Sequence, residues 1–104
     1  MRTFGIEEEF QFLMPDTLVP ANVGAEVFRR LSDSLEWHDV THREFMASQV
    51  EHASAVFESL EDARAALVGF RRTIAGYAAE LGVVAASVGT SPQAPPFPAV
   101  ADVE

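Results

Sequence analysis

The residues near the start of the chain alternate between apolar and polar side chains, which predicts a β-strand over residues 3–12. One face of this strand would carry Phe4, Ile6, Phe10 and Phe12, and the other would carry Glu7, Glu9 and Gln11. Glu8 is the exception, because it places a carboxylate on the apolar face. Pro15 and Asp16 end the strand, since proline removes a ladder donor and aspartate favours a turn.

Apolar residues at helical spacing predict a first helix over residues 23–35, with Asn22 as its N-cap. Its apolar side would carry Val27, Phe28, Leu31 and Leu35. Polar residues occupy the opposite side, so we expect this helix to be amphipathic. Arg29 and Arg30 could hold a phosphate, although paired arginines on an amphipathic helix usually belong to the solvated side.

A second helix is predicted from Ser59 to Gly82. Ser59 and Asp62 form the capping pattern of a helix start, and glycine commonly closes a helix. Its apolar stripe consists of Leu60, Ala63, Leu67, Phe70, Ile74, Tyr77 and Leu81. About three heptads flanked by strands favour a helix laid across a sheet over a coiled coil.

Two more strands complete the predicted order of strand, helix, strand, helix, strand. Residues 44–53 alternate loosely, and residues 83–88 form a short β-branched run. The tail over residues 93–104 is rich in proline and is expected to run over the surface. The order predicts an α+β fold in which a sheet carries helices on one face and acids on the other.

Composition limits the class of protein and its partners. The 104 residues, 48% of them hydrophobic, suit one globular domain. Seven basic and 16 acidic residues give a net charge of −9, which argues against nucleic acid or an anionic membrane as partner and favours cations. Without cysteine, a signal peptide or a membrane-spanning run, we expect a soluble cytoplasmic protein.

Glu7 and Glu9 would project side by side from the first strand, about 6.5–7 Å apart along the backbone. Their charges repel at neutral pH, and a divalent cation between them would relieve that repulsion. The alternative is an exposed edge strand whose acids only discourage aggregation.

Three ordered motifs resemble one enzyme family: Gly-Ile-Glu-Glu-Glu-Phe at residues 5–10, Gln-Val-Glu at 49–51 and Gly-Thr-Ser-Pro at 89–92. The chain is similar to glutamate-cysteine ligases of type 2, also described as carboxylate-amine ligases. The resemblance implies a glutamine synthetase-like fold, in which an antiparallel sheet forms a saddle with helices on its convex face. Residues 1–92 would then be the N-terminal portion of a catalytic domain.

The resemblance also implies a site on the concave face. Glu7, Glu9 and Glu51 match the family's metal-binding acids, so Mg²⁺ or Mn²⁺ and ATP are the expected cofactor and co-substrate. Gln49 would orient a ligand, or would simply be a polar residue of a half-exposed strand. The implied reaction phosphorylates a carboxylate, usually that of glutamate, and an amine such as cysteine then attacks the acyl phosphate.

Two departures separate this chain from the family pattern. Ser91 stands where many relatives have histidine, and the chain is about a third as long as the family's enzymes. We therefore expect it to be inactive alone and, since a sheet cut from a larger saddle exposes an edge, to form homo-oligomers. His38 and His42 are spaced like zinc ligands, but they straddle a predicted loop and favour surface positions.

Two other classes of function remain open. The chain would also suit a small acidic interaction module that has no active site, with acids that serve solubility. A third possibility is an oligomerisation domain that uses the helix from Leu60 to Leu81 as its interface.

Overall fold

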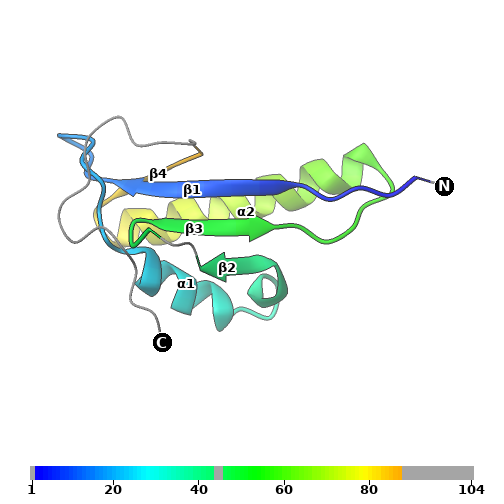
Figure 1. Ribbon diagram of the computed structural model, residues 1–104, viewed down its shortest axis with the longest axis horizontal. Helices are drawn as coiled ribbons and strands as arrows, with labels where there is room; N and C mark the ends of the chain where they lie inside the picture. Colours follow the sequence, from blue (N-terminus) through cyan, green and yellow to red (C-terminus); the bar gives the residue numbers. More distant parts are fainter. Residues whose placement is uncertain (1, 44–45, 88–104) are drawn as a thin grey trace.

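The computed structural model describes residues 2–43 and 46–87. It confirms the α+β class with an antiparallel four-stranded sheet in the order β2-β3-β1-β4. Figure 1 shows these strands side by side with α2 running behind them. The elements in chain order are β1 Glu7–Leu13, α1 Gly24–Ser32, the short 3₁₀ helix η1 His38–Val40, β2 Thr41–Arg43, β3 Gln49–Ala53, α2 Leu60–Glu80 and β4 Val84–Ala86.

The sheet contains one strand more than the sequence predicted. The expected strand over residues 44–53 is represented by β3, and β2 precedes it as a separate edge strand. A strand of three residues, two of them exposed, gives no alternation that a sequence pattern can detect. Residues 44–45, the Gly-Thr-Ser-Pro motif and the tail over residues 93–104 lie outside the described residues.

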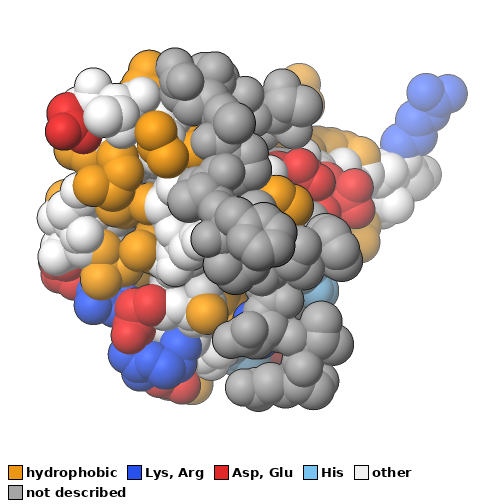
Figure 2. Space-filling model, turned by 60° about the vertical axis from the view of Figure 1, so that its left-hand side comes forward, with side chains coloured by type: hydrophobic (Ala, Val, Ile, Leu, Met, Phe, Trp, Pro, Cys, Tyr) orange, Lys and Arg blue, Asp and Glu red, His pale blue; other side chains and the backbone are white. Residues whose placement is uncertain are grey.

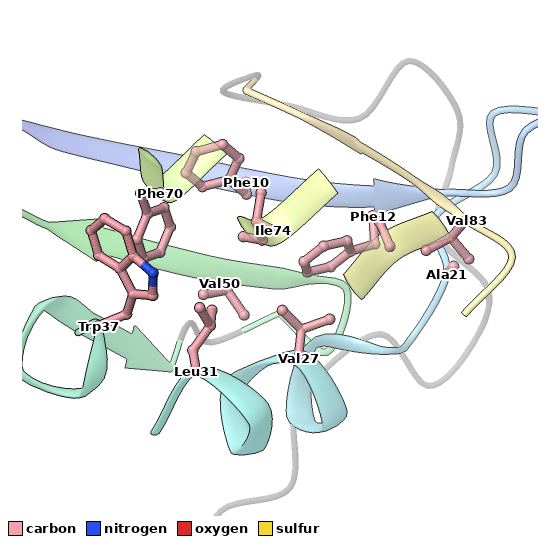
Figure 3. Packing of buried hydrophobic residues seen from close by; sticks show 11 residues of the cluster. Phe10, Phe12, Ala21, Val27, Leu31, Trp37, Val50, Phe70, Ile74 and Val83 are labelled. Carbon is pink, nitrogen blue, oxygen red and sulfur yellow. The ribbon is translucent and has the colours of Figure 1, made fainter. Parts of the chain in front are cut away.

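The hydrophobic core lies between the sheet and both helices (Figure 3). Phe12 and Val50 contribute from the sheet, Leu31 from α1, and Phe70 from α2, all of them fully buried. The ring of Trp37 meets Phe70 edge to face with 5.4 Å between centroids. The predicted stripe of α2 therefore packs within the chain at its centre, which argues against that stripe as an oligomer interface.

Two residues that the helical patterns assigned to the core are exposed instead. Leu35 is 93% exposed because α1 ends at Ser32, three residues earlier than its apolar stripe suggested. Leu60 is 80% exposed because it occupies the first turn of α2. Within residues 2–43 and 46–87, no helix is both long and apolar enough to cross a membrane.

The predicted ends of α2 are confirmed. The hydroxyl of Ser59 accepts a hydrogen bond from the backbone N–H of Asp62 at 3.1 Å. Gly82 closes the helix with a φ of +73°, a conformation that only glycine adopts without strain. Local chemistry alone thus sets both ends of this helix.

The predicted start of α1 is wrong. Val23, rather than Asn22, occupies the N-cap position, and no side chain caps the helix there. The backbone N–H of Gly24 instead donates to the carbonyl oxygen of Ala47 at 2.9 Å. A Cβ at Gly24 would lie 2.6 Å from that oxygen and 2.7 Å from the carbonyl oxygen of Gln49. A tertiary backbone contact therefore fixes where α1 begins.

Candidate functional site

The face of the sheet opposite the helices carries the predicted site residues. Since Phe10 and Val50 point into the core, the strand alternation turns Glu7, Glu9 and Glu51 to the other face. Gln49 shares that face with Glu51. The sequence thus predicted correctly which side chains share this surface, which we call the open face and define by β1 residues 7, 9 and 11, β3 residues 49 and 51, and β2 residue 42.

Glu9 and Glu51 lie directly opposite each other on neighbouring strands. Backbone hydrogen bonds run from Phe12 to Ser48 at 2.8 Å and from Ser54 to Ile6 at 2.9 Å. The hydrogen-bonded pairs of this ladder are therefore the even-numbered residues of β1, and Glu9–Glu51 is a non-hydrogen-bonded pair. Such pairs have Cα atoms only about 4.5 Å apart. Two carboxylates are thus held close together on the open face.

Glu7 lies farther along β1, opposite Ala53. The described residues contain no group of three histidine, cysteine, aspartate or glutamate side chains arranged to hold a metal ion. The donor set that the open face offers is therefore the carboxylate pair, with Glu7 one strand repeat away. A pair of carboxylates suits Mg²⁺, which keeps several waters and is often bound through one or two carboxylates plus substrate phosphates.

His42 extends the carboxylate pair to a third strand. It lies opposite Glu51 on β2, so His42, Glu51 and Glu9 form one row across three strands. His42 is exposed, as expected, but its place in this row was missed because β2 was not predicted. His38 lies in η1, where its Nδ1 is 3.0 Å from the carbonyl oxygen of Ser34.

Gln11 lies opposite Gln49 and one strand repeat from Glu9. It is buried, with only 2% of its surface exposed. Its Nε2 donates to the hydroxyl of Ser48 at 3.3 Å, whereas its Oε1 has no hydrogen-bond partner in the described part of the chain. The sequence placed Gln11 on the polar face without giving it a role.

Glu8 faces the helices and is almost buried beside α2. Burial raises the pKa of its carboxyl, but hydrogen bonds from Arg71 and Ser87 and the charges of Arg71 and His52 together bring that pKa below its ordinary value. A pocket of about 560 Å³ lies beside this pair. It is lined by Glu8, Phe10, Arg71, Ile74, Ala75, Ala85 and Ser87.

His52 points away from Glu51 and into the core, because successive side chains of a strand lie on opposite faces. Its ring stacks on Phe70 with 3.9 Å between centroids, and its Nδ1 has no hydrogen-bond partner among the described residues. Burial is the main cause that lowers the pKa of His52, and Arg71 and His42 lower it further while Glu8 raises it. His52 is therefore a core residue that is uncharged at neutral pH, and it is separate from the open face.

Comparison with known proteins identifies the family of this chain. A family model described as glutamate-cysteine ligase family 2 matches residues 3–102. The chain is 46% identical over 90 residues to "Putative glutamate--cysteine ligase 2-1" of Saccharopolyspora erythraea. The alignment covers 86% of the present chain and 23% of that protein. It is 37% identical over 93 residues to "Putative glutamate--cysteine ligase 2" of Rhodopirellula baltica. This alignment covers 86% of the present chain and 25% of that protein.

The chain thus spans about a quarter of the length of these curated relatives. No solved structure matches it significantly. The family match covers the first strand with its acids, the second acidic strand and both helices. On that evidence, the protein belongs to glutamate-cysteine ligase family 2.

Proposed function

We propose that the open face is the metal- and nucleotide-binding surface of an ATP-dependent carboxylate-amine ligase, on the concave side of a glutamine synthetase-like saddle. The observation that carries this proposal is the Glu9–Glu51 pair. Like charges directly opposite each other destabilise a sheet, and a bound divalent cation would relieve that repulsion. Family membership supports the ligase class.

In this proposal, Glu9 and Glu51 bind Mg²⁺ or Mn²⁺ together with the phosphates of ATP, and Glu7 supplies a further carboxylate. The bound metal would neutralise charge on the transferring phosphoryl group. The chain's own task is to position these acids, which the antiparallel pairing of β1 with β3 achieves. Gln49, on the same face, would orient a ligand by hydrogen bonding.

The proposed reaction has two steps. A substrate carboxylate attacks the γ-phosphorus of ATP and forms an acyl phosphate with release of ADP. An amine nitrogen then attacks the acyl carbon, an amide bond forms, and inorganic phosphate and a proton leave. The names of the relatives favour glutamate as the carboxylate and cysteine as the amine. Because the reaction consumes ATP, we place the protein in the cytoplasm.

We also propose that copies of the chain associate. In the described residues, β4 pairs with β1 only over residues 11–13, so residues 7–10 of β1 have no strand on that side. Val56 and Leu60 are exposed. On the different face that Figure 2 shows, hydrophobic side chains lie between separate groups of acids. Free edges and exposed apolar side chains recruit partners. Sedimentation as a monomer at micromolar concentration would contradict this proposal.

Paramagnetic broadening by Mn²⁺ tests the metal role. When Mn²⁺ and ATP are added to the isotope-labelled chain, the backbone amide signals of Glu9 and Glu51 are expected to broaden first. Glu26 in α1 and Asp33 at its C-cap are the internal control, because they are acids away from the open face. If the control signals broaden as much as those of Glu9 and Glu51, Mn²⁺ binds acids unselectively and the proposed function is wrong.

A further inference from the structure

The side chain of Gln11 has a hydrogen-bonding group that the described structure does not use. Its Oε1 is buried and has no partner among the described residues. A buried polar atom without a partner destabilises the fold, and buried groups of this kind are rare in folded proteins. The unused oxygen of Gln11 therefore points to a ligand.

The other end of the Gln11 amide is fixed. Its Nε2 donates to the hydroxyl of Ser48, which is itself buried. Ser48 precedes β3, and its carbonyl oxygen accepts the N–H of Phe12, so this part of the turn is held against β1. With one end of the amide anchored, Oε1 is a pre-oriented acceptor rather than a freely rotating one.

The residues that share a sheet face with Gln11 indicate what its Oε1 can bind. Gln11 lies one strand repeat from Glu9, which itself lies opposite Glu51, and all three share the open face. Ionised carboxylates and an amide oxygen only accept hydrogen bonds. A ligand that satisfies them must therefore carry several donors, and positive charge favours it further next to the two acids. A primary ammonium group, with three N–H donors and one positive charge, has this chemistry.

We propose that Gln11 is a substrate-positioning residue whose Oε1 accepts a hydrogen bond from a primary ammonium group bound beside Glu9. This inference rests on the proposed function, because amino-acid substrates carry such a group. Gln11 would thereby fix the orientation of an amino acid relative to the carboxylate pair. Ser48 acts through Gln11 by holding its amide.

Nuclear magnetic resonance of the chain, with ethylammonium as the probe, tests the proposal. The side-chain NH₂ signals of Gln11 are expected to shift saturably as ethylammonium is added at constant ionic strength. Tetramethylammonium is the matched control, since it carries the same charge without an N–H donor, and it is expected to cause no such shift. No saturable shift with ethylammonium, or equal shifts with both cations, would overturn the proposal.

Gln11→Met provides the second arm, because methionine retains a similar length without the amide. Hydrogen bonds to charged groups are worth about 1.5–3 kcal/mol, so ethylammonium should bind at least about tenfold more weakly to this variant. The backbone amide spectrum shows whether the variant is folded. Unchanged affinity in a folded variant would overturn the proposal.

Mg²⁺ alone distinguishes this inference from the proposed function. If Mg²⁺ without amine shifts the Gln11 signals as ethylammonium does, the donor is a metal-bound water and the ammonium assignment is wrong. If ethylammonium binds through Gln11 while Mn²⁺ shows no preference for Glu9 and Glu51, the metal role fails and the ammonium site stands. If Mn²⁺ binds there and ethylammonium does not, only the ammonium site fails.

Discussion

Arg71 of α2 holds the Glu8 carboxylate of β1 through three hydrogen bonds, two from Nε at 3.0 and 3.2 Å and one from Nη2 at 2.6 Å. This pair explains why three consecutive acids fit into one strand. Glu8 faces the helices and is neutralised there, whereas Glu7 and Glu9 face the other way. The triplet therefore combines one structural acid with two acids available for binding.

The Glu8–Arg71 pair should stabilise the fold at neutral pH. Arg71→Met leaves a nearly buried carboxylate without its main partner, but Arg71 is 54% exposed and solvent screens the pair. We therefore expect a loss of about 1–2 kcal/mol in the free energy of unfolding at pH 7, less than for a fully buried pair. Urea denaturation of this variant measures the loss, with Arg72→Met as the control on the exposed side of α2.

The same pair predicts a dependence on acid pH. The pKa of Glu8 in the folded chain is below its ordinary value of 4.5, so its contribution is present above about pH 4.5 and is lost as the pH falls through the folded pKa. The difference in stability between the wild type and Arg71→Met should shrink below pH 4.5. A difference that stays constant down to pH 3 would show that Arg71 acts through packing alone.

His52 predicts a second pH effect, at higher pH. Its pKa is below its ordinary value of 6.5 in the folded chain, so the unfolded chain binds more protons as the pH falls through 6.5. The free energy of unfolding should decrease from pH 6.5 toward the folded pKa. His52→Leu removes this decrease, and His38→Gln, which alters an exposed histidine, retains it. The prediction is wrong if the free energy of unfolding changes equally with pH in the wild type, His52→Leu and His38→Gln.

Two glycines should respond in opposite directions to alanine. At Gly24 a methyl group would collide with backbone atoms of Ala47 and Gln49, and overpacking of this kind costs about 1–3 kcal/mol. At Gly76, in α2, a methyl group meets nothing within 4 Å, so Gly76→Ala should stabilise by about 0.5–1 kcal/mol. Thermal unfolding of both variants compares the two effects. A stable Gly24→Ala variant would mean that α1 does not depend on this close approach.

The Glu9–Glu51 pair should reduce the stability of the metal-free chain. Like charges directly opposite in a sheet cost about 0.2–1 kcal/mol, so Glu51→Gln is expected to raise the unfolding midpoint in urea. Added Mn²⁺ should stabilise the wild type and leave this variant unchanged. Glu36→Gln, which removes an exposed acid outside the sheet, controls for the general effect of net charge.

The sequence predicted those features that local chemistry determines. The faces of β1 follow from its alternation, and the ends of α2 follow from Ser59, Asp62 and Gly82. These signals come from residues that are close together in the chain, so the features they predict do not depend on contacts with distant residues. The open face and three of its acids were predictable for the same reason.

The features that the sequence did not predict depend on contacts between distant residues. α1 starts at Gly24 because of its backbone contact with Ala47, and β2 exists because it pairs with β3. The row from His42 to Glu9 follows from that pairing. The unused oxygen of Gln11 becomes visible only once its burial and its hydrogen bond to Ser48 are known.

The most direct test of the metal role is a calorimetric titration of the 104-residue chain with Mn²⁺, beside a Glu9→Gln/Glu51→Gln double variant. The proposed function predicts saturable binding to the wild type that is lost in the double variant, while both proteins retain the same fold. Saturable binding of equal strength to both proteins, or none to the wild type, would contradict the assignment of the carboxylate pair as a metal site.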